Sequence, residues 1–163
     1  MKKLFFIPLI AAISILAVPS KSNAQALGTS YTTGVGVKLG YWGGGALDIK
    51  YFMQPTKALE GQLGFGPDWF TITGLYEFHG PIEGAPGLLW YVGPGAHIGF
   101  WNTSYRDHHS GTGGAFFGVD GVLGLDYKFN RAPIDLSLDI QPEVSVPDGG
   151  FGIWGGLGIR FTF

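Results

Sequence analysis

The chain contains no cysteine, and this absence removes several kinds of chemistry at once. Without cysteine there is no disulfide framework, no thiolate zinc site, no cysteine nucleophile and no lipid-modified cysteine. Charge is also scarce, since Asp, Glu, Lys and Arg make up 13% of the 163 residues, against about 25% in typical soluble proteins. The basic residues form no cluster, so we expect no nucleic acid partner. High apolarity with low charge argues against disorder, and the length fits one domain.

A long apolar run occurs only at the N-terminus. There Lys2 and Lys3 precede an uncharged apolar stretch over 4–18, and Ser22-Asn23-Ala24 supplies the small residues of an export cleavage site. The stretch is too short for a membrane-spanning helix, which needs about 20 residues. We therefore predict a signal peptide over 1–24. Its removal takes away three lysines and leaves 7 basic and 12 acidic residues, a net charge of −5.

The mature domain, 25–163, consists of segments in which apolar and polar residues alternate. A period of two is typical of β-strands, and each segment ends at Gly, Pro, Asn or Asp, which favour turns. No amphipathic helix pattern of useful length occurs. The alternation predicts eight strands, at 30–41, 46–53, 58–66, 69–79, 88–101, 115–129, 134–145 and 151–163. Proline has no N–H for a β-ladder, so we expect a bulge or a rim position at Pro94 and at Pro142.

The charges of these strands all lie on one face. Every charged residue within the predicted strands stands opposite the aliphatic face, and His97 shares the charged face. The resulting candidate polar network comprises Lys38, Asp48, Lys50, Glu60, Glu77, His97, Asp120, Asp126, Lys128, Asp135, Asp139, Glu143 and Arg160. A soluble barrel keeps its apolar face inside, whereas a membrane barrel turns that face toward lipid and lines its interior with polar side chains.

The order of residues along the apolar face favours the membrane barrel. Its aliphatic residues occupy the middle of the strands, and its aromatic residues lie near the ends, as in the two aromatic girdles of membrane barrels. The expected girdles are Tyr41, Phe65, Phe70, Phe100, Phe117 and Phe151 near one rim, and Tyr31, Tyr51, Tyr76, Phe78, Trp90, Tyr127, Phe129, Phe161 and Phe163 near the other. In lipid every backbone N–H and C=O group must be paired within the protein, and for a sheet this requires a closed barrel. We therefore predict an all-β fold: an eight-stranded, antiparallel, up-and-down transmembrane β-barrel.

The export signal, the eight alternating strands and the ending Leu157-x-Ile159-x-Phe161-x-Phe163 resemble the small Gram-negative outer-membrane β-barrels of the OmpA/OmpX-like family. The resemblance covers the whole mature chain. It implies a monomer in the outer membrane, in contact with its lipid. In that family a terminal Phe preceded by alternating hydrophobic residues is read by the barrel-assembly machinery, and the resemblance implies this role for Leu157, Ile159, Phe161 and Phe163.

An eight-stranded lumen is just wide enough for side chains to fill it. We therefore expect a structural or surface-interaction role, without enzymatic activity, cofactor or metal. The excess of acids over bases in the network leaves open a narrow cation-preferring channel or a small-ligand-binding barrel. The third alternative is a lipid A-modifying enzyme, whose best nucleophile and base would be in Asp107-His108-His109-Ser110, within the longest predicted loop. We expect His97 to hydrogen-bond an interior carboxylate.

Overall fold

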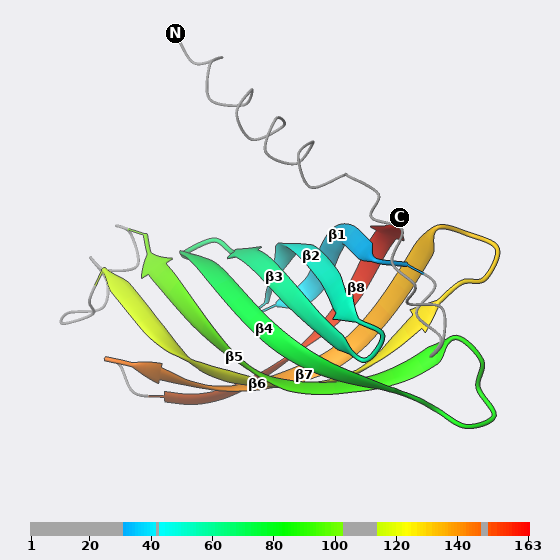
Figure 1. Cartoon of the computed structure of the whole chain (residues 1–163). Coiled ribbons are helices and arrows are strands. Elements are labelled where there is room, and N and C mark those ends of the chain that lie inside the picture. Colours follow the sequence, from blue (N-terminus) through cyan, green and yellow to red (C-terminus); the bar gives the residue numbers. More distant parts are fainter. Residues whose placement is uncertain (1–30, 42, 103–113, 148–149) are drawn as a thin grey trace, which may run out of the picture.

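A computed structural model describes residues 31–41, 43–102, 114–147 and 150–163, and these form one closed barrel of eight antiparallel strands. Each strand pairs with its neighbours in the sequence, and the first pairs with the last (Figure 1). The predicted eight-stranded antiparallel barrel is thereby confirmed. Within the described part of the chain, no helix is long and apolar enough to cross a membrane. The strands are β1 (Thr33–Tyr41), β2 (Gly44–Gln54), β3 (Lys57–Phe65), β4 (Trp69–Pro81), β5 (Leu88–Trp101), β6 (Ala115–Lys128), β7 (Ile134–Val146) and β8 (Gly150–Thr162).

Strand bounds follow the prediction closely, and one of the two-residue extensions lies at a glycine run. We expected the second strand to begin at Ala46, but it begins at Gly44. Glycine carries no polarity signal, yet Gly45 pairs with Leu39 and Gly44 with Tyr41, so the β1–β2 hairpin continues through both. The predicted signal peptide over 1–24 lies outside the described residues.

The two strand prolines overturn one expectation. Pro94 pairs with Gly121 of β6 in an unbroken ladder, and on its β4 side the paired register is the same before and after a short interruption between Leu75 and Phe78. Pro142 likewise interrupts the β6–β7 ladder without a register shift. The expected bulges or rim positions are therefore wrong. The missing N–H removes ladder bonds toward one neighbouring strand and leaves the other ladder intact.

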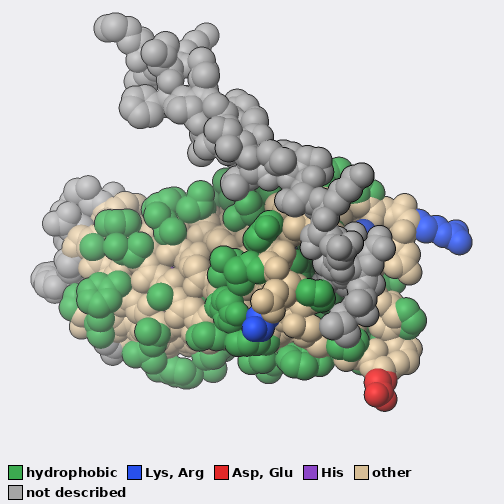
Figure 2. Space-filling view, in the orientation of Figure 1, with side chains coloured by type: hydrophobic (Ala, Val, Ile, Leu, Met, Phe, Trp, Pro, Cys, Tyr) green, Lys and Arg blue, Asp and Glu red, His purple; other side chains and the backbone are tan. Residues whose placement is uncertain are grey.

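The alternation separates an apolar outer wall from a polar interior. On β7, Asp135 and Asp139 are buried, whereas Leu138 is 59% and Ile140 50% exposed. Figure 2 shows hydrophobic side chains spread over the visible wall, with few charged ones among them. Eleven of the twelve charged residues of the predicted strands are buried, and the exception is Lys128.

Most of the expected girdle lies on the outer wall, but Tyr31 does not. Its side chain is buried and packs edge-on against Phe52, with ring centroids 5.2 Å apart, in an interior cluster with Ala58. Tyr31 precedes β1, so the strand alternation does not set its direction. The exposed aromatic residues are Phe65, Phe70, Phe100, Phe117 and Phe151 toward one rim and Tyr51, Phe78, Trp90, Tyr127, Phe129, Phe161 and Phe163 toward the other, while Tyr76 is half-buried. The Tyr41 side chain lies outside the described part.

Apolar side chains also occupy three levels of the interior. Tyr31, Phe52 and Ala58 lie toward the end that holds both described termini. Leu75, Tyr91 and Val122 form a second cluster. At the opposite end, Ala46, Trp69 and Trp154 pack together with Trp101 against them. The polar interior is thus bounded by apolar layers.

Candidate functional site

The lumen holds an ion-pair network centred on Arg160 of β8. One terminal guanidinium nitrogen, Nη2, lies 2.8 Å from Asp48 and 2.7 Å from Glu60. The other, Nη1, lies 3.2 Å from Asp126 and 2.9 Å from Asp135. The planar guanidinium offers five donors in a fixed fork, which suits it to several carboxylates at once. One side chain thereby connects β2, β3, β6, β7 and β8.

Two lysines complete the network. Lys38 Nζ lies 2.8 Å from Glu60 and 2.7 Å from Asp139. Lys50 Nζ lies 3.0 Å from Glu60, 2.9 Å from Glu77 and 2.9 Å from Asp126. Glu60 therefore contacts all three cations. The exposed fraction of these lysine and glutamate side chains is 0%, so the ion pairs are shielded from bulk water.

Tyr91 and His79 belong to the same network, although the sequence did not lead us to expect them there. The Tyr91 hydroxyl donates to Asp139 over 2.6 Å, and the Lys50 ammonium lies 4.1 Å from the centre of its ring. His79 Nε2 lies 2.9 Å from Glu77, and its ring stacks on Tyr91. The alternation carried a signal for Tyr91, because it has the same parity on β5 as His97.

Lys128 lies apart from this network. We expected it among the interior residues because it continues the polar face of β6. Its ammonium instead donates to the backbone carbonyls of Phe129 and Ala132, at 2.8 and 2.7 Å, at the β6–β7 turn. Lys128 ends its strand, so its long side chain reaches the carbonyls of the turn.

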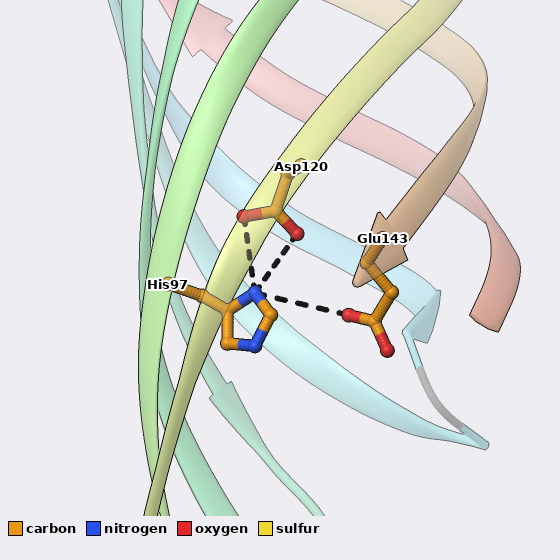
Figure 3. Close-up of side chains that lie close together, drawn as sticks. All are labelled: His97, Asp120 and Glu143. Carbon is orange, nitrogen blue, oxygen red and sulfur yellow. Dashed lines mark hydrogen bonds and ion pairs between the residues drawn. The ribbon is translucent and has the colours of Figure 1, made fainter. Parts of the chain in front are cut away.

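The remaining predicted residues form a second cluster toward the end opposite the termini. His97, Asp120 and Glu143 come from β5, β6 and β7, and their side chains point toward one another (Figure 3). His97 Nδ1 lies 2.9 and 3.0 Å from the two Asp120 oxygens and 3.8 Å from Glu143 Oε2. Its other ring nitrogen, Nε2, lies 3.1 Å from Ser145 Oγ. His97 thus contacts an interior carboxylate, as we expected.

The backbone around this cluster leaves room for the imidazole. A Cβ on Gly118 would lie 2.7 Å from His97 Cε1, so the ring rests against the bare backbone of β6. The Phe116 ring meets the imidazole edge-on from the same strand, with centroids 5.8 Å apart. Adjacent paired strands therefore hold His97 on a rigid surface, the kind of support that a precise site requires.

The four residues of the expected assembly signal lie on the outer wall. Leu157, Ile159, Phe161 and Phe163 are all exposed. The backbone of Phe163 also closes the barrel, because its N–H donates to the Thr33 carbonyl over 2.9 Å and its own carbonyl accepts from the Thr33 N–H over 3.0 Å. The Asp107-His108-His109-Ser110 cluster lies outside the described residues.

No family model, no curated protein and no solved structure matches the chain. The class that the described residues define is an all-β barrel of eight antiparallel strands with an apolar outer wall and a charged, tightly packed interior.

Proposed function

We propose that the chain is a small integral outer-membrane β-barrel protein, exported through a signal peptide over 1–24 that is cleaved after Ala24. The observation that carries this proposal is the inversion of polarity: charged side chains fill the lumen while large aliphatic and aromatic side chains cover the outside. An apolar surface of this extent aggregates in water, and lipid is the solvent that matches it. Barrel closure removes every sheet edge, as a bilayer requires.

Within that setting, the proposed role is structural or one of surface interaction. The lumenal cations are fully buried and each contacts two or more carboxylates, which supports a filled lumen over a water-filled channel. The termini of the barrel would face the periplasm, and the β5–β6 connection, the longest between the described strands, would face the exterior. This connection is the natural place for a surface contact. Outer-membrane lipid and, during assembly, the barrel-assembly machinery are the proposed partners of a monomer.

Expression in a Gram-negative host tests the proposal directly. We expect the mature chain in the outer-membrane fraction, resistant to extraction by alkaline carbonate. It should migrate faster in gels before boiling than after, because a closed barrel resists detergent denaturation. A chain that lacks residues 1–24 is the matched control and should stay in the cytoplasm. Recovery of the full chain in the soluble periplasm, or migration that boiling does not change, would contradict the proposal.

A further inference from the structure

We propose that His97, Asp120 and Glu143 form a binding site for a divalent first-row transition-metal ion of the Zn²⁺ type. The three side chains come from adjacent strands, are buried, and place one nitrogen and two carboxylate groups within 4.8 Å of one another (Figure 3). The inference does not rest on membrane insertion, because a barrel in any solvent would hold the same three groups.

The distances between the donor atoms fit an ion of this size. Zn²⁺ binds nitrogen and carboxylate oxygen at about 2.0–2.2 Å, which in tetrahedral geometry separates ligand atoms by about 3.3 Å. His97 Nδ1 lies 2.9 and 3.0 Å from the Asp120 oxygens and 3.8 Å from Glu143 Oε2. These separations bracket the ideal value, so small side-chain rotations place all three groups around one ion. Water would complete the coordination.

Ser145 supplies the second contact that a metal-binding histidine needs. Histidine ligands usually donate their other ring N–H to a fixed acceptor, which sets the tautomer and the ring orientation. His97 Nε2 lies 3.1 Å from Ser145 Oγ. With that hydrogen on Nε2, the lone pair of Nδ1 points at two carboxylates, so that a cation between them would meet one nitrogen and two carboxylate groups.

The charge distribution of the lumen favours a cation here. Lys38, Lys50 and Arg160 form ion pairs with other carboxylates, and Asp120 forms one with His97. Asp120 and Glu143 place two carboxylate groups at this cluster, and both would attract a divalent cation.

The other buried histidine, His79, differs from His97 in how the neighbouring carboxylates are placed around its ring. His79 also lies near two carboxylates, Glu77 at 2.9 Å and Asp126 at 3.6 Å. Those carboxylates lie on opposite ring nitrogens, and both already contact Lys50. The carboxylates near His97 instead converge on a single nitrogen. His79 therefore serves as the matched control.

The donor set selects the class of metal. Imidazole favours Zn²⁺, Co²⁺ and Ni²⁺ over Mg²⁺ and Ca²⁺, which prefer six or more oxygen ligands. None of the three donors is a thiolate or a thioether, which are the ligands that select Cu(I).

Metal titration of the purified mature chain in detergent micelles tests the site. All variants are made in a background chain that carries His108→Gln and His109→Gln and has no polyhistidine tag. His79 and His97 are then the remaining histidines of the mature chain. We expect one equivalent of Co²⁺ to bind with a visible ligand-field spectrum, Zn²⁺ to displace it, and Mg²⁺ to leave it unchanged. His97→Gln and Asp120→Asn should abolish the spectrum, and Ser145→Ala should weaken Zn²⁺ binding by roughly 10-fold. His79→Gln should bind Co²⁺ as the background does.

Each variant is checked for the heat-dependent gel shift of the closed barrel, and Glu143→Gln, which keeps side-chain volume, replaces any variant that does not fold. A spectrum that survives both His97→Gln and Asp120→Asn would overturn the proposal, and so would a folded background chain that binds no Co²⁺. Labelling of Ser145 by a fluorophosphonate in the presence of saturating Zn²⁺ would also overturn it, because that reaction needs His97 as a base on Nε2, with the proton on Nδ1.

Discussion

Glu60 is the carboxylate that contacts all three cations of the lumenal ion-pair network. It accepts from Lys38, Lys50 and Arg160 at 2.7–3.0 Å, and the side chains that meet there come from four different strands. A buried ion pair is a weak source of net stability, because desolvation opposes the Coulombic attraction. Removal of one partner is costly, however, since it leaves an uncompensated charge. The network therefore determines which single substitutions the barrel tolerates.

Lys38→Met tests this asymmetry. The change keeps most of the side-chain volume but leaves Glu60 and Asp139 without the ammonium that contacts both. We expect the free energy of unfolding to fall by about 3–5 kcal/mol, as measured by urea titration in detergent micelles with tryptophan fluorescence. Lys128→Met is the matched control. It removes hydrogen bonds at an exposed turn, and we expect it to cost about 1 kcal/mol. Equal losses for both variants would contradict the network.

At the scale of the strand, the β1–β8 seam depends on close backbone contact. Gly36 of β1 pairs with Arg160 of β8, and a Cβ on Gly36 would overlap the backbone carbonyl oxygen of Ile159. Gly74 of β4 is also a strand glycine, but a Cβ there would meet nothing within 4 Å. The two positions separate a steric requirement from a preference for glycine as such.

Gly36→Ala should therefore weaken closure, whereas Gly74→Ala should not. We expect the first substitution to lower the free energy of unfolding by about 1–3 kcal/mol through overpacking. For the second we expect no change or a gain of up to about 1 kcal/mol, because alanine restricts the unfolded chain more than glycine does. The fraction of each chain that keeps the fast-migrating form as temperature rises measures both effects. Loss of that form in Gly74→Ala alone would refute this account of the seam.

The sequence predicted the strands and their faces because alternation is a local property. It could not predict which charges meet, because the barrel geometry brings Lys38 and Asp139, 101 residues apart, into contact. It also placed Tyr31 on the wrong face, since alternation holds only inside a strand. The prediction of a bulge or rim position at Pro94 was wrong for a related reason. A missing N–H removes bonds of one ladder, and the sequence does not tell whether the strand responds with a bulge.

At the scale of the whole molecule, the polarity of the outer wall determines whether the barrel is more stable in water or in lipid. A charge on that wall is harmless in water but costly in lipid, and the cost depends on depth. Leu138 lies midway along β7 on the exposed face, whereas Val146 ends the strand at the rim. Both are exposed apolar residues of one strand, so they form a matched pair.

Leu138→Arg should lower the free energy of unfolding in phospholipid vesicles by about 2–4 kcal/mol, and Val146→Arg should lower it by about 0–1 kcal/mol. Vesicle folding at graded urea concentrations, followed by tryptophan fluorescence, gives both values. A barrel whose outer wall faces water would show changes within about 0.5 kcal/mol at both sites, and that result would contradict membrane insertion.

The position of Arg160 on the last strand has a consequence for how the barrel forms. Arg160 belongs to the last strand, while its partners Asp48 and Glu60 belong to the second and third. An open sheet of seven strands leaves these carboxylates without the guanidinium, and an unpaired guanidinium in hydrocarbon is strongly disfavoured. In a bilayer we therefore expect partly inserted species to have a high free energy and a short lifetime. If the barrel lies in a membrane as proposed, we expect insertion of β8 and neutralisation of the lumen to occur together, as the last step of barrel formation.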